Sequence, residues 1–352
     1  MVAGGGTGGH FFPALEVARA LKERGERVFF VGVKRGIEAK LAPKFGFDIR
    51  FFPFEGLRGR GIFASLKAVL KLPVAVALAV HAVRVEEVRG IFCTGGYASF
   101  PAAVAAVVAG IPLFIHEQNS VPGWANLFAS RFAREVWVSF QESGRCFVKA
   151  RRIRHTGNIV RKNIRDVKYR LPPLGVFRLL VIGGSSGART INKAVCDALP
   201  QLNRLGLVLR HQVGGLDAEW VQERYREAGV PWRPEVFIED MLSAYREASF
   251  VISRAGATTL FELSGVGRTG ILVPYPYAVG DHQRINAEVL AVRGAALCID
   301  NSELSGENLL KVVVRFFFNR RLIVRMSQRI YRILKLCDVE GEIERLRNEV
   351  SV

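Results

Sequence analysis

The residues best placed for chemistry stand at the start of the chain, in the run Gly4-Gly5-Gly6-Thr7-Gly8-Gly9-His10. The glycines let the backbone turn sharply and approach a ligand closely, and the amphipathic helix that follows offers unpaired N–H groups and a positive dipole end. The run therefore predicts an anion-binding loop. His10 adds an imidazole, the side chain whose charge changes nearest neutral pH. A loop that only held a dinucleotide does not need this group, so we interpret His10 as a candidate general base rather than a helix cap.

The elements that must position this loop are strands and helices in alternation. Strands are predicted at 27–33, 49–54, 91–93 and 113–116, then at 177–182, 207–212, 236–238, 250–252, 271–273 and 296–299. Only a stub of a strand fits before the first loop, at residues 1–3. A second glycine loop, Gly183-Gly184-Ser185-Ser186-Gly187-Ala188, opens the second half. The alternation predicts two Rossmann-like, doubly wound parallel sheets, which would face each other across a ligand-binding cleft.

The amino-acid composition is typical of two folded domains, and the net charge favours an acidic binding partner. The chain has 352 residues, long for one core, with 49% hydrophobic and 23% charged residues. Its net charge of +18 favours nucleic acid, anionic lipid or a phosphorylated substrate. Basic residues gather at 145–170 and at 311–335, where aromatic side chains are interleaved. Because no nucleic-acid-binding motif accompanies them, lipid or phosphate is favoured and nucleic acid is not expected.

Neither a signal peptide nor a membrane-spanning helix is predicted. No basic or apolar segment precedes the first glycines, prolines and a glycine interrupt the apolar run 94–115, and the apolar run 72–83 is too short. The cysteines lack metal-ligand spacing, and we expect reduced core thiols in a cytoplasmic protein. They are Cys93, Cys146, Cys196, Cys298 and Cys337.

Two other classes of function compete at this stage. Gly4, Gly6 and Gly9 satisfy G-x-G-x-x-G, which is typical of a Rossmann oxidoreductase. The acid expected near the end of the second strand is missing at 31–35, although Lys34 and Arg35 suit the 2'-phosphate of NADP. A single dinucleotide would leave the second glycine loop unexplained. A basic, non-enzymatic protein that binds nucleic acid or membranes explains the charge but not His10.

A series of motifs resembles the MurG family of glycosyltransferases, which have the GT-B fold. The motifs run in order along nearly the whole chain: GGGTGGH, LRGRG, TGGY, HEQN, GNIVR, GGSSGA, FIEDM, SRAGATTLFE and DHQRINA. The resemblance implies transfer of GlcNAc from UDP-GlcNAc to the C4 hydroxyl of MurNAc in lipid I, which gives lipid II for peptidoglycan synthesis. It also implies an acceptor domain at 1–158 plus a C-terminal helix at about 335–352, and a donor domain at 159–334.

Inverting transfer needs a base for the acceptor hydroxyl and positive groups for the leaving pyrophosphate. The resemblance assigns His10 and Glu117 to catalysis and assigns the donor to Thr7, Gly8, Gly9, Asn119, Arg161, Ser185, Ser186, Ile238, Ala257, Thr258, Glu262, Gln283 and Asn286. Glu262, two helical turns after Arg254, is expected to accept the ribose hydroxyls. Ser186 stands where the family usually has Gln. No D-x-D pair occurs in an expected loop, so neither a metal nor another cofactor is expected.

The acceptor that the resemblance implies carries a polyprenyl tail, so the enzyme is expected to work peripherally on the cytoplasmic face of the membrane. The residues assigned to the acceptor or the anionic membrane are Arg58, Arg60, Leu66, Val69, Leu70, Tyr97 and His116. His116, Glu117 and Asn119 are also candidates for orienting His10. An apolar stripe from residue 62 with flanking cations is typical of an interfacial anchor, and the alternative is a core helix whose lysines reach solvent.

Overall fold

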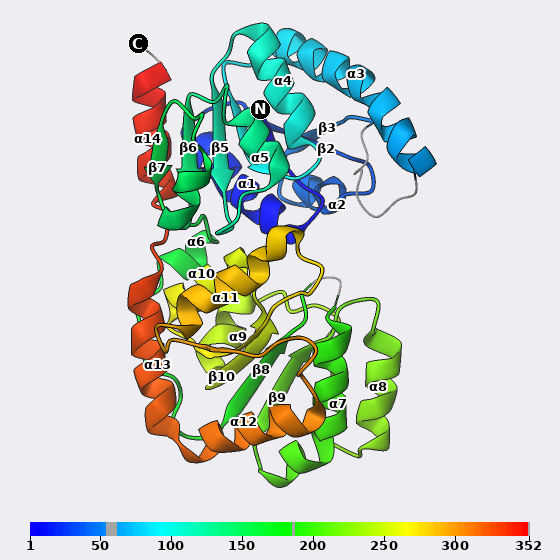
Figure 1. Cartoon of the computed structure of the whole chain (residues 1–352), viewed down its shortest axis with the longest axis vertical. Helices are drawn as coiled ribbons and strands as arrows, with labels where there is room; N and C mark the ends of the chain where they lie inside the picture. The colour runs from blue at the N-terminus through cyan, green and yellow to red at the C-terminus, as the bar shows by residue number, and fades with distance from the viewer. Residues whose placement is uncertain (54–61, 185–186, 351–352) are drawn as a thin grey trace. The chain divides into compact units, whose positions relative to one another are not determined.

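The computed structural model describes residues 1–53, 62–184 and 187–350 and divides the chain into two compact units (Figure 1). The first unit is Met1–Arg161 with Lys335–Val352, and the second is Lys162–Leu334. Each unit is built on one parallel sheet, the class that the strand–helix alternation predicted. Parallel strands need helical crossovers, so each sheet has helices packed against it.

The first unit contains a seven-stranded sheet of order β3-β2-β1-β4-β5-β6-β7. Its strands are β1 (Val2–Gly4), β2 (Phe29–Gly32), β3 (Asp48–Phe51), β4 (Ile91–Gly95), β5 (Leu113–Glu117), β6 (Glu135–Val138) and β7 (Ile153–His155). Its helices are α1 (Gly8–Lys22), α2 (Ile37–Lys44), α3 (Ile62–Val85), α4 (Ser99–Ala109), α5 (Trp124–Ala129), the 3-10 turn Gln141–Cys146 and α14 (Val339–Val350). The short strand β1 is stable because it pairs on both edges, with Val2 beside Phe30 and Phe92.

Two strands of this sheet were not predicted from the sequence. Strand β6 begins with Glu135, which is fully buried. A carboxylate is seldom buried without a partner, so its presence in the sequence does not predict a core strand. The partners come from Arg152 and from Arg345 of the distant helix α14, while the indole of Trp137 donates at 2.6 Å. Helix α14 also packs on α1, and Arg24, which follows α1, pairs with Glu344 at 3.0 Å. The C-terminal segment thus completes the first unit.

The second unit contains a five-stranded sheet of order β12-β11-β10-β8-β9. Its strands are β8 (Arg178–Ile182), β9 (Val208–Gln212), β10 (Phe250–Arg254), β11 (Gly270–Val273) and β12 (Leu297–Cys298). Its helices are α6 (Lys162–Arg165), α7 (Arg189–Arg204), α8 (Ala218–Glu227), α9 (Met241–Glu247), α10 (Ala257–Val266), the 3-10 turn Val279–Asp281, α11 (His282–Ala291), α12 (Gly306–Phe318) and α13 (Arg320–Ile333). The strand predicted at 236–238 was wrong, because only one isolated bridge forms there, between Gln212 and Glu235.

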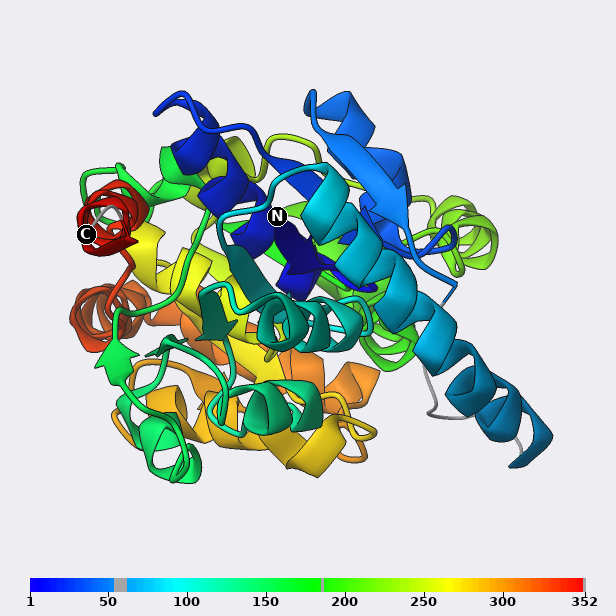
Figure 2. The same ribbon diagram turned by 90° about the horizontal axis from the view of Figure 1, so that it is seen from above.

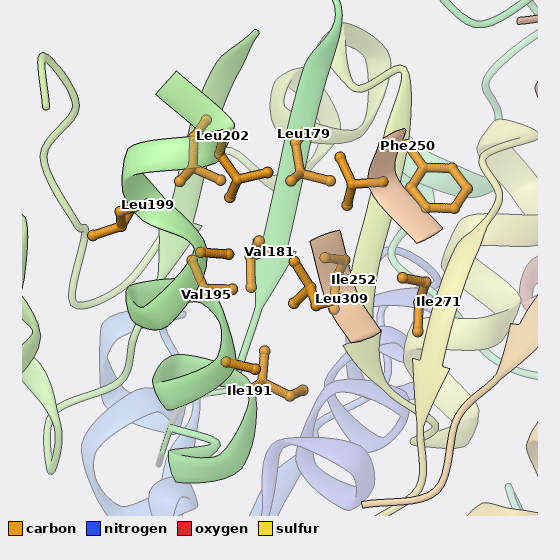
Figure 3. Packing of buried hydrophobic residues seen from close by; sticks show 14 of the residues in the cluster. Leu179, Val181, Ile191, Val195, Leu199, Leu202, Phe250, Ile252, Ile271 and Leu309 are labelled. Carbon is orange, nitrogen blue, oxygen red and sulfur yellow. The ribbon is translucent and has the colours of Figure 1, made fainter. Parts of the chain in front are cut away.

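The core of the second unit lies between β8 and α7. Figure 3 shows Leu179 and Val181 of the strand pointing toward Ile191 and Val195 of the helix. Burying each such side chain contributes about 1.5–3 kcal/mol. The packing fixes where α7 begins, and therefore where the second glycine loop ends.

In the first unit, α3 lies beside α4 (Figure 2). Its alanines Ala75 and Ala79 are buried, while Leu70 and Val74 are exposed. In the described part of the chain, no helix combines the length and apolar character that crossing a membrane requires.

The expectation that all cysteines are core thiols was wrong for two of them, because Cys146 is exposed and Cys298 is only half-buried.

Candidate functional site

His10 lies in the first turn of α1 with its ring held in one orientation. Its Nδ1 is 2.8 Å from the carbonyl oxygen of Thr94 and 3.2 Å from Oε1 of Gln118. Both partners are acceptors, so Nδ1 carries the proton and Nε2 keeps its lone pair. This is the tautomer that a general base needs when it works through Nε2.

The turn after β4 supplies the support for His10. The hydroxyl of Thr94 donates to the carbonyl of His10 at 2.8 Å. A side chain at Gly95 would meet the imidazole, and one at Gly96 would collide with the carbonyl of Gly5. Both glycines also have positive φ. The TGGY motif therefore allows two loops to approach closely.

Gln118 is an orienting residue that our sequence reasoning missed. Its Nε2 donates to the carbonyl of Thr94 at 2.8 Å and lies 3.2 Å from Nδ1 of His116, so its Oε1 faces His10. The signal was present, since Gln118 is the third residue of HEQN. Only the fold shows that this side chain, rather than its neighbours, reaches the imidazole.

His116 and Glu117, which were predicted at the acceptor and in catalysis, lie in the interior of the first unit. The ring of His116 is completely buried, with Nε2 3.2 Å from the hydroxyl of Ser139, and burial lowers its pKa to about 3. It presents no surface to an acceptor. The carboxylate of Glu117 accepts from the backbone N–H groups of Asn119 and Gly123, both at 3.0 Å, and thereby holds this loop. Within the described residues, the contacts of Nδ1 of His10 come from Thr94 and Gln118 instead.

The other residues predicted in the first unit lie at or near the surface. Thr7 and Gly9 are exposed, Gly8 and Asn119 are half-buried, and Tyr97 is exposed. Arg161, which was predicted at the donor, belongs to the first unit, where its guanidinium lies 4.6 Å from the ring centroid of Phe12. Stacking of this kind fixes the direction of the side chain.

Glu262 occupies the middle of α10 and is almost completely buried. The hydroxyl of Tyr245, on α9, donates to its Oε2 at 3.0 Å. At the start of the same helix, Ala257 is buried and Thr258 is half-buried, next to backbone N–H groups of the first turn. A hydrogen-bonded carboxylate and a helix N-terminus therefore belong to one element.

Three further residues that were predicted to bind UDP-GlcNAc differ in their exposure and in their hydrogen-bond partners. The N–H of Ile238 donates to Oε1 of Gln212 at 3.2 Å, a partner that sequence reasoning missed. Gln283, near the start of α11, is half-buried and its Oε1 accepts from the N–H of Tyr275 at 3.0 Å. The side chain of Asn286, which was predicted to read sugar hydroxyls, is completely buried, and its Nδ2 donates to the carbonyl of Ala255 at 3.3 Å. Asn286 supports the loop before α10.

Some predicted residues lie outside the described residues, namely Arg58, Arg60, Ser185 and Ser186, together with the side chains of Leu66 and Val69. Leu70 is described, and 70% of it is exposed. It begins an exposed stripe on α3 that continues with Val74 and Leu78, one helical turn apart. Helix α5, which packs on α4, exposes Trp124, whose ring stacks on Phe100 of α4 with 5.5 Å between the ring centroids.

Across residues 1–53, 62–184 and 187–350, no three His, Cys, Asp or Glu side chains gather in a way that could hold a metal ion.

Two family models match the chain. The glycosyltransferase family 28 N-terminal domain matches residues 1–138, and the glycosyltransferase family 28 C-terminal domain matches residues 178–335. Together they include both glycine loops and all the motifs around His10 and Glu262.

Curated relatives match over most of their length. A protein of Syntrophus aciditrophicus (strain SB) is 42% identical over 332 residues, which cover 93% of this chain and 92% of the relative. One of Myxococcus xanthus (strain DK1622) is 40% identical over 318 residues, covering 89% and 83%. Both are named UDP-N-acetylglucosamine--N-acetylmuramyl-(pentapeptide) pyrophosphoryl-undecaprenol N-acetylglucosamine transferase.

Solved structures agree. MurG of Acinetobacter baumannii superposes with a TM-score of 0.78 at 31% identity, covering 99% of this chain and 98% of that one. The spinosyn forosaminyltransferase SpnP, at 15% identity and a TM-score of 0.67, shares the fold alone.

Proposed function

The chain belongs to the MurG family within glycosyltransferase family 28, and from this membership we propose how its residues carry out the reaction. The protein is a GT-B glycosyltransferase that transfers N-acetylglucosamine from UDP-GlcNAc to MurNAc-pentapeptide pyrophosphoryl-undecaprenol. The product is the lipid-linked disaccharide used for peptidoglycan and cell wall synthesis.

His10 acts as the general base. The C4 hydroxyl of MurNAc attacks the anomeric carbon of GlcNAc while Nε2 of His10 takes its proton, and the bond to UDP breaks on the opposite face. One displacement of this kind inverts the anomeric configuration. The fixed acceptors at Nδ1, Thr94 and Gln118, support the assignment because they leave Nε2 as the basic atom and stabilise the imidazolium that forms.

The second unit binds the donor. Glu262 accepts the ribose hydroxyls, the carbonyl of Ile238 contacts uracil, and Gln283 reads the sugar. The helix N-terminus at Ala257 and Thr258 faces the diphosphate, because its N–H groups and dipole favour negative charge. Ser185, Ser186 and Arg161 are assigned to the same diphosphate by the family motifs.

In this proposal, protein groups rather than a metal ion stabilise the negative charge of the leaving UDP. Incubation with UDP-GlcNAc and a lipid I analogue is expected to give UDP and disaccharide in equal amounts, with or without EDTA. Loss of turnover in EDTA contradicts the metal-free part. Product that depends on NADPH and a carbonyl compound favours an oxidoreductase, and tight DNA or RNA binding without turnover favours a basic binding protein.

We also propose that the protein works on the cytoplasmic face of the membrane as a peripheral protein. The undecaprenyl chain of the acceptor stays in the bilayer, so the enzyme must reach the lipid surface. The exposed stripe Leu70, Val74 and Leu78 of α3 supports binding to the membrane surface. Apolar side chains that are flanked by cations bind the surface of membranes with anionic lipids. Arg58 and Arg60, in the preceding loop, are assigned to the lipid pyrophosphate.

Changing Leu70, Val74 and Leu78 together to Ser is expected to reduce binding to vesicles of phosphatidylglycerol and phosphatidylcholine by about tenfold or more, because each buried aliphatic side chain contributes on the order of 1.5 kcal/mol. The KM for a long-chain acceptor rises, while turnover of a short-chain, water-soluble acceptor stays the same. Sedimentation with vesicles measures the first effect.

The matched control changes Leu171, Leu174 and Val176 to Ser, three exposed apolar residues of the second unit. This control is expected to bind vesicles as the wild type does. Docking through α3 is contradicted if the folded α3 variant and the control bind equally well.

A further inference from the structure

Glu38 is an almost completely buried carboxylate beneath the first glycine loop. It lies in the first turn of α2, and both of its oxygens accept from backbone N–H groups. Oε2 accepts from Gly6 at 2.8 Å, and Oε1 accepts from Val33, just after β2, at 3.0 Å. The carboxylate thus joins the glycine loop, the end of β2 and the start of α2.

Three glycines make room for this carboxylate. A Cβ atom at Gly5, Gly32 or Gly36 would collide with the side chain of Glu38. None of the three has a positive φ, so a glycine is required there for space and not for an unusual backbone conformation. The first glycine loop, the end of β2 and the residue before α2 therefore leave together a space for one carboxylate.

In a nucleotide-binding loop of this sequence, the backbone N–H groups point at phosphate. Here the N–H of Gly6 points at Glu38. We propose that Glu38 is the built-in anion of the first glycine loop and a positioning residue for His10. The acid that seemed to be missing after the second strand is present a few residues later, turned toward the loop. A phosphate at Gly6 would meet a negative charge at close range, which disfavours a dinucleotide there.

Contacts along the loop connect Glu38 to His10. Beyond Gly6, the carbonyl of Thr7 accepts from the N–H groups of His10 at 3.2 Å and Phe11 at 3.0 Å, and so begins α1. On the other side, the turn at Thr94 holds the carbonyl and the ring of His10. When the hydrogen bond between Gly6 and Glu38 is lost, the glycine loop no longer holds the start of α1, and only the turn at Thr94 still holds His10. The ring of His10 then moves away from the acceptors that set its tautomer.

One consequence is independent of catalysis. The substitution Glu38→Ala leaves a gap lined by two N–H donors, which formate fits. Formate is expected to raise the Tm of this variant but not that of the wild type, and chloride at equal ionic strength is expected to raise neither. Glu38→Gln, which fills the gap, is expected to show no formate effect. No shift in the alanine variant, or equal shifts in all three proteins, overturns the role as loop anion.

The second consequence rests on the proposed role of His10 as base. Glu38→Ala is expected to lower kcat by up to about 100-fold, the effect of misplacing a catalytic group by about 1 Å, with the KM for UDP-GlcNAc within about twofold. Formate restores kcat. In a His10→Ala background, Glu38→Ala is expected to cost no further kcat, because its effect acts through His10.

Glu135→Ala is the matched control, since Glu135 is a buried carboxylate of the same unit held by Arg345. It is expected to lower Tm and leave kcat unchanged. An equal loss of kcat from Glu38→Ala in both backgrounds overturns the positioning role. Normal turnover of His10→Ala alone overturns the proposed base instead, and the formate shift still decides whether Glu38 is the loop anion.

Discussion

Replacing His10 by alanine is expected to reduce turnover by about 10²- to 10⁴-fold, the usual contribution of a positioned base. The acceptor hydroxyl then has no group to take its proton as the new bond forms. Binding of UDP stays nearly unchanged, because the residues proposed to hold its ribose and uracil, Glu262 and Ile238, belong to the second unit. Steady-state kinetics with a water-soluble acceptor and calorimetry with UDP measure the two effects.

His155→Ala is the matched control, since this exposed histidine lies in β7 of the same unit and its ring lies 3.1 Å from the carbonyl oxygen of Ser139. It is expected to leave turnover unchanged. A His10→Ala protein that turns over at near the wild-type rate removes His10 from the mechanism.

Replacing Glu262 by alanine is expected to weaken UDP binding by about 1.5–3 kcal/mol, the value of a hydrogen bond to a charged group. Tyr245 holds this carboxylate in place, so its loss removes an acceptor that is already oriented. The loss is expected to be smaller with 2'-deoxy-UDP, which lacks one of the two hydroxyls. Calorimetry with the two nucleotides measures this difference.

Gln283→Ala is the companion variant, and it is expected to bind UDP normally while discriminating less between UDP-GlcNAc and UDP-glucose. Glu288→Ala, an exposed carboxylate on the same helix as Gln283, serves as the neutral control. Equal losses of UDP binding from the Glu262 and Gln283 variants contradict the division between ribose and sugar.

Most of the fold followed from local patterns, and its exceptions have non-local causes. Strands buried on both faces read as continuous apolar runs, so β2, β5, β8 and β10 were predictable. Strand β6 was missed because Glu135 obtains its partner Arg345 from the far end of the chain. The segment 236–238 is apolar enough for a strand, but its N–H at Ile238 bonds to the side chain of Gln212 instead.

The site was predictable in its motifs but not in the direction of each side chain. The position of His10 after a glycine loop marked it correctly as a residue at the helix start. The HEQN motif did not reveal that His116 and Glu117 turn into the interior while Gln118 reaches His10. A main-chain carbonyl such as that of Thr94 leaves no sequence signal at all. Glu38 was overlooked because the acid expected after the second strand is one that binds the ribose of a dinucleotide, whereas Glu38 binds the first glycine loop of the protein itself.

The central claim is that one displacement, assisted by His10, joins the two sugars. The anomeric configuration of the disaccharide, read from the NMR coupling of its new anomeric proton, tests this claim most directly. From the α-linked donor UDP-GlcNAc, one displacement is expected to give a β-1,4 linkage as the sole product. An α-linked product retains the configuration of the donor, which one displacement from the opposite face cannot give, and it would contradict the role assigned to His10.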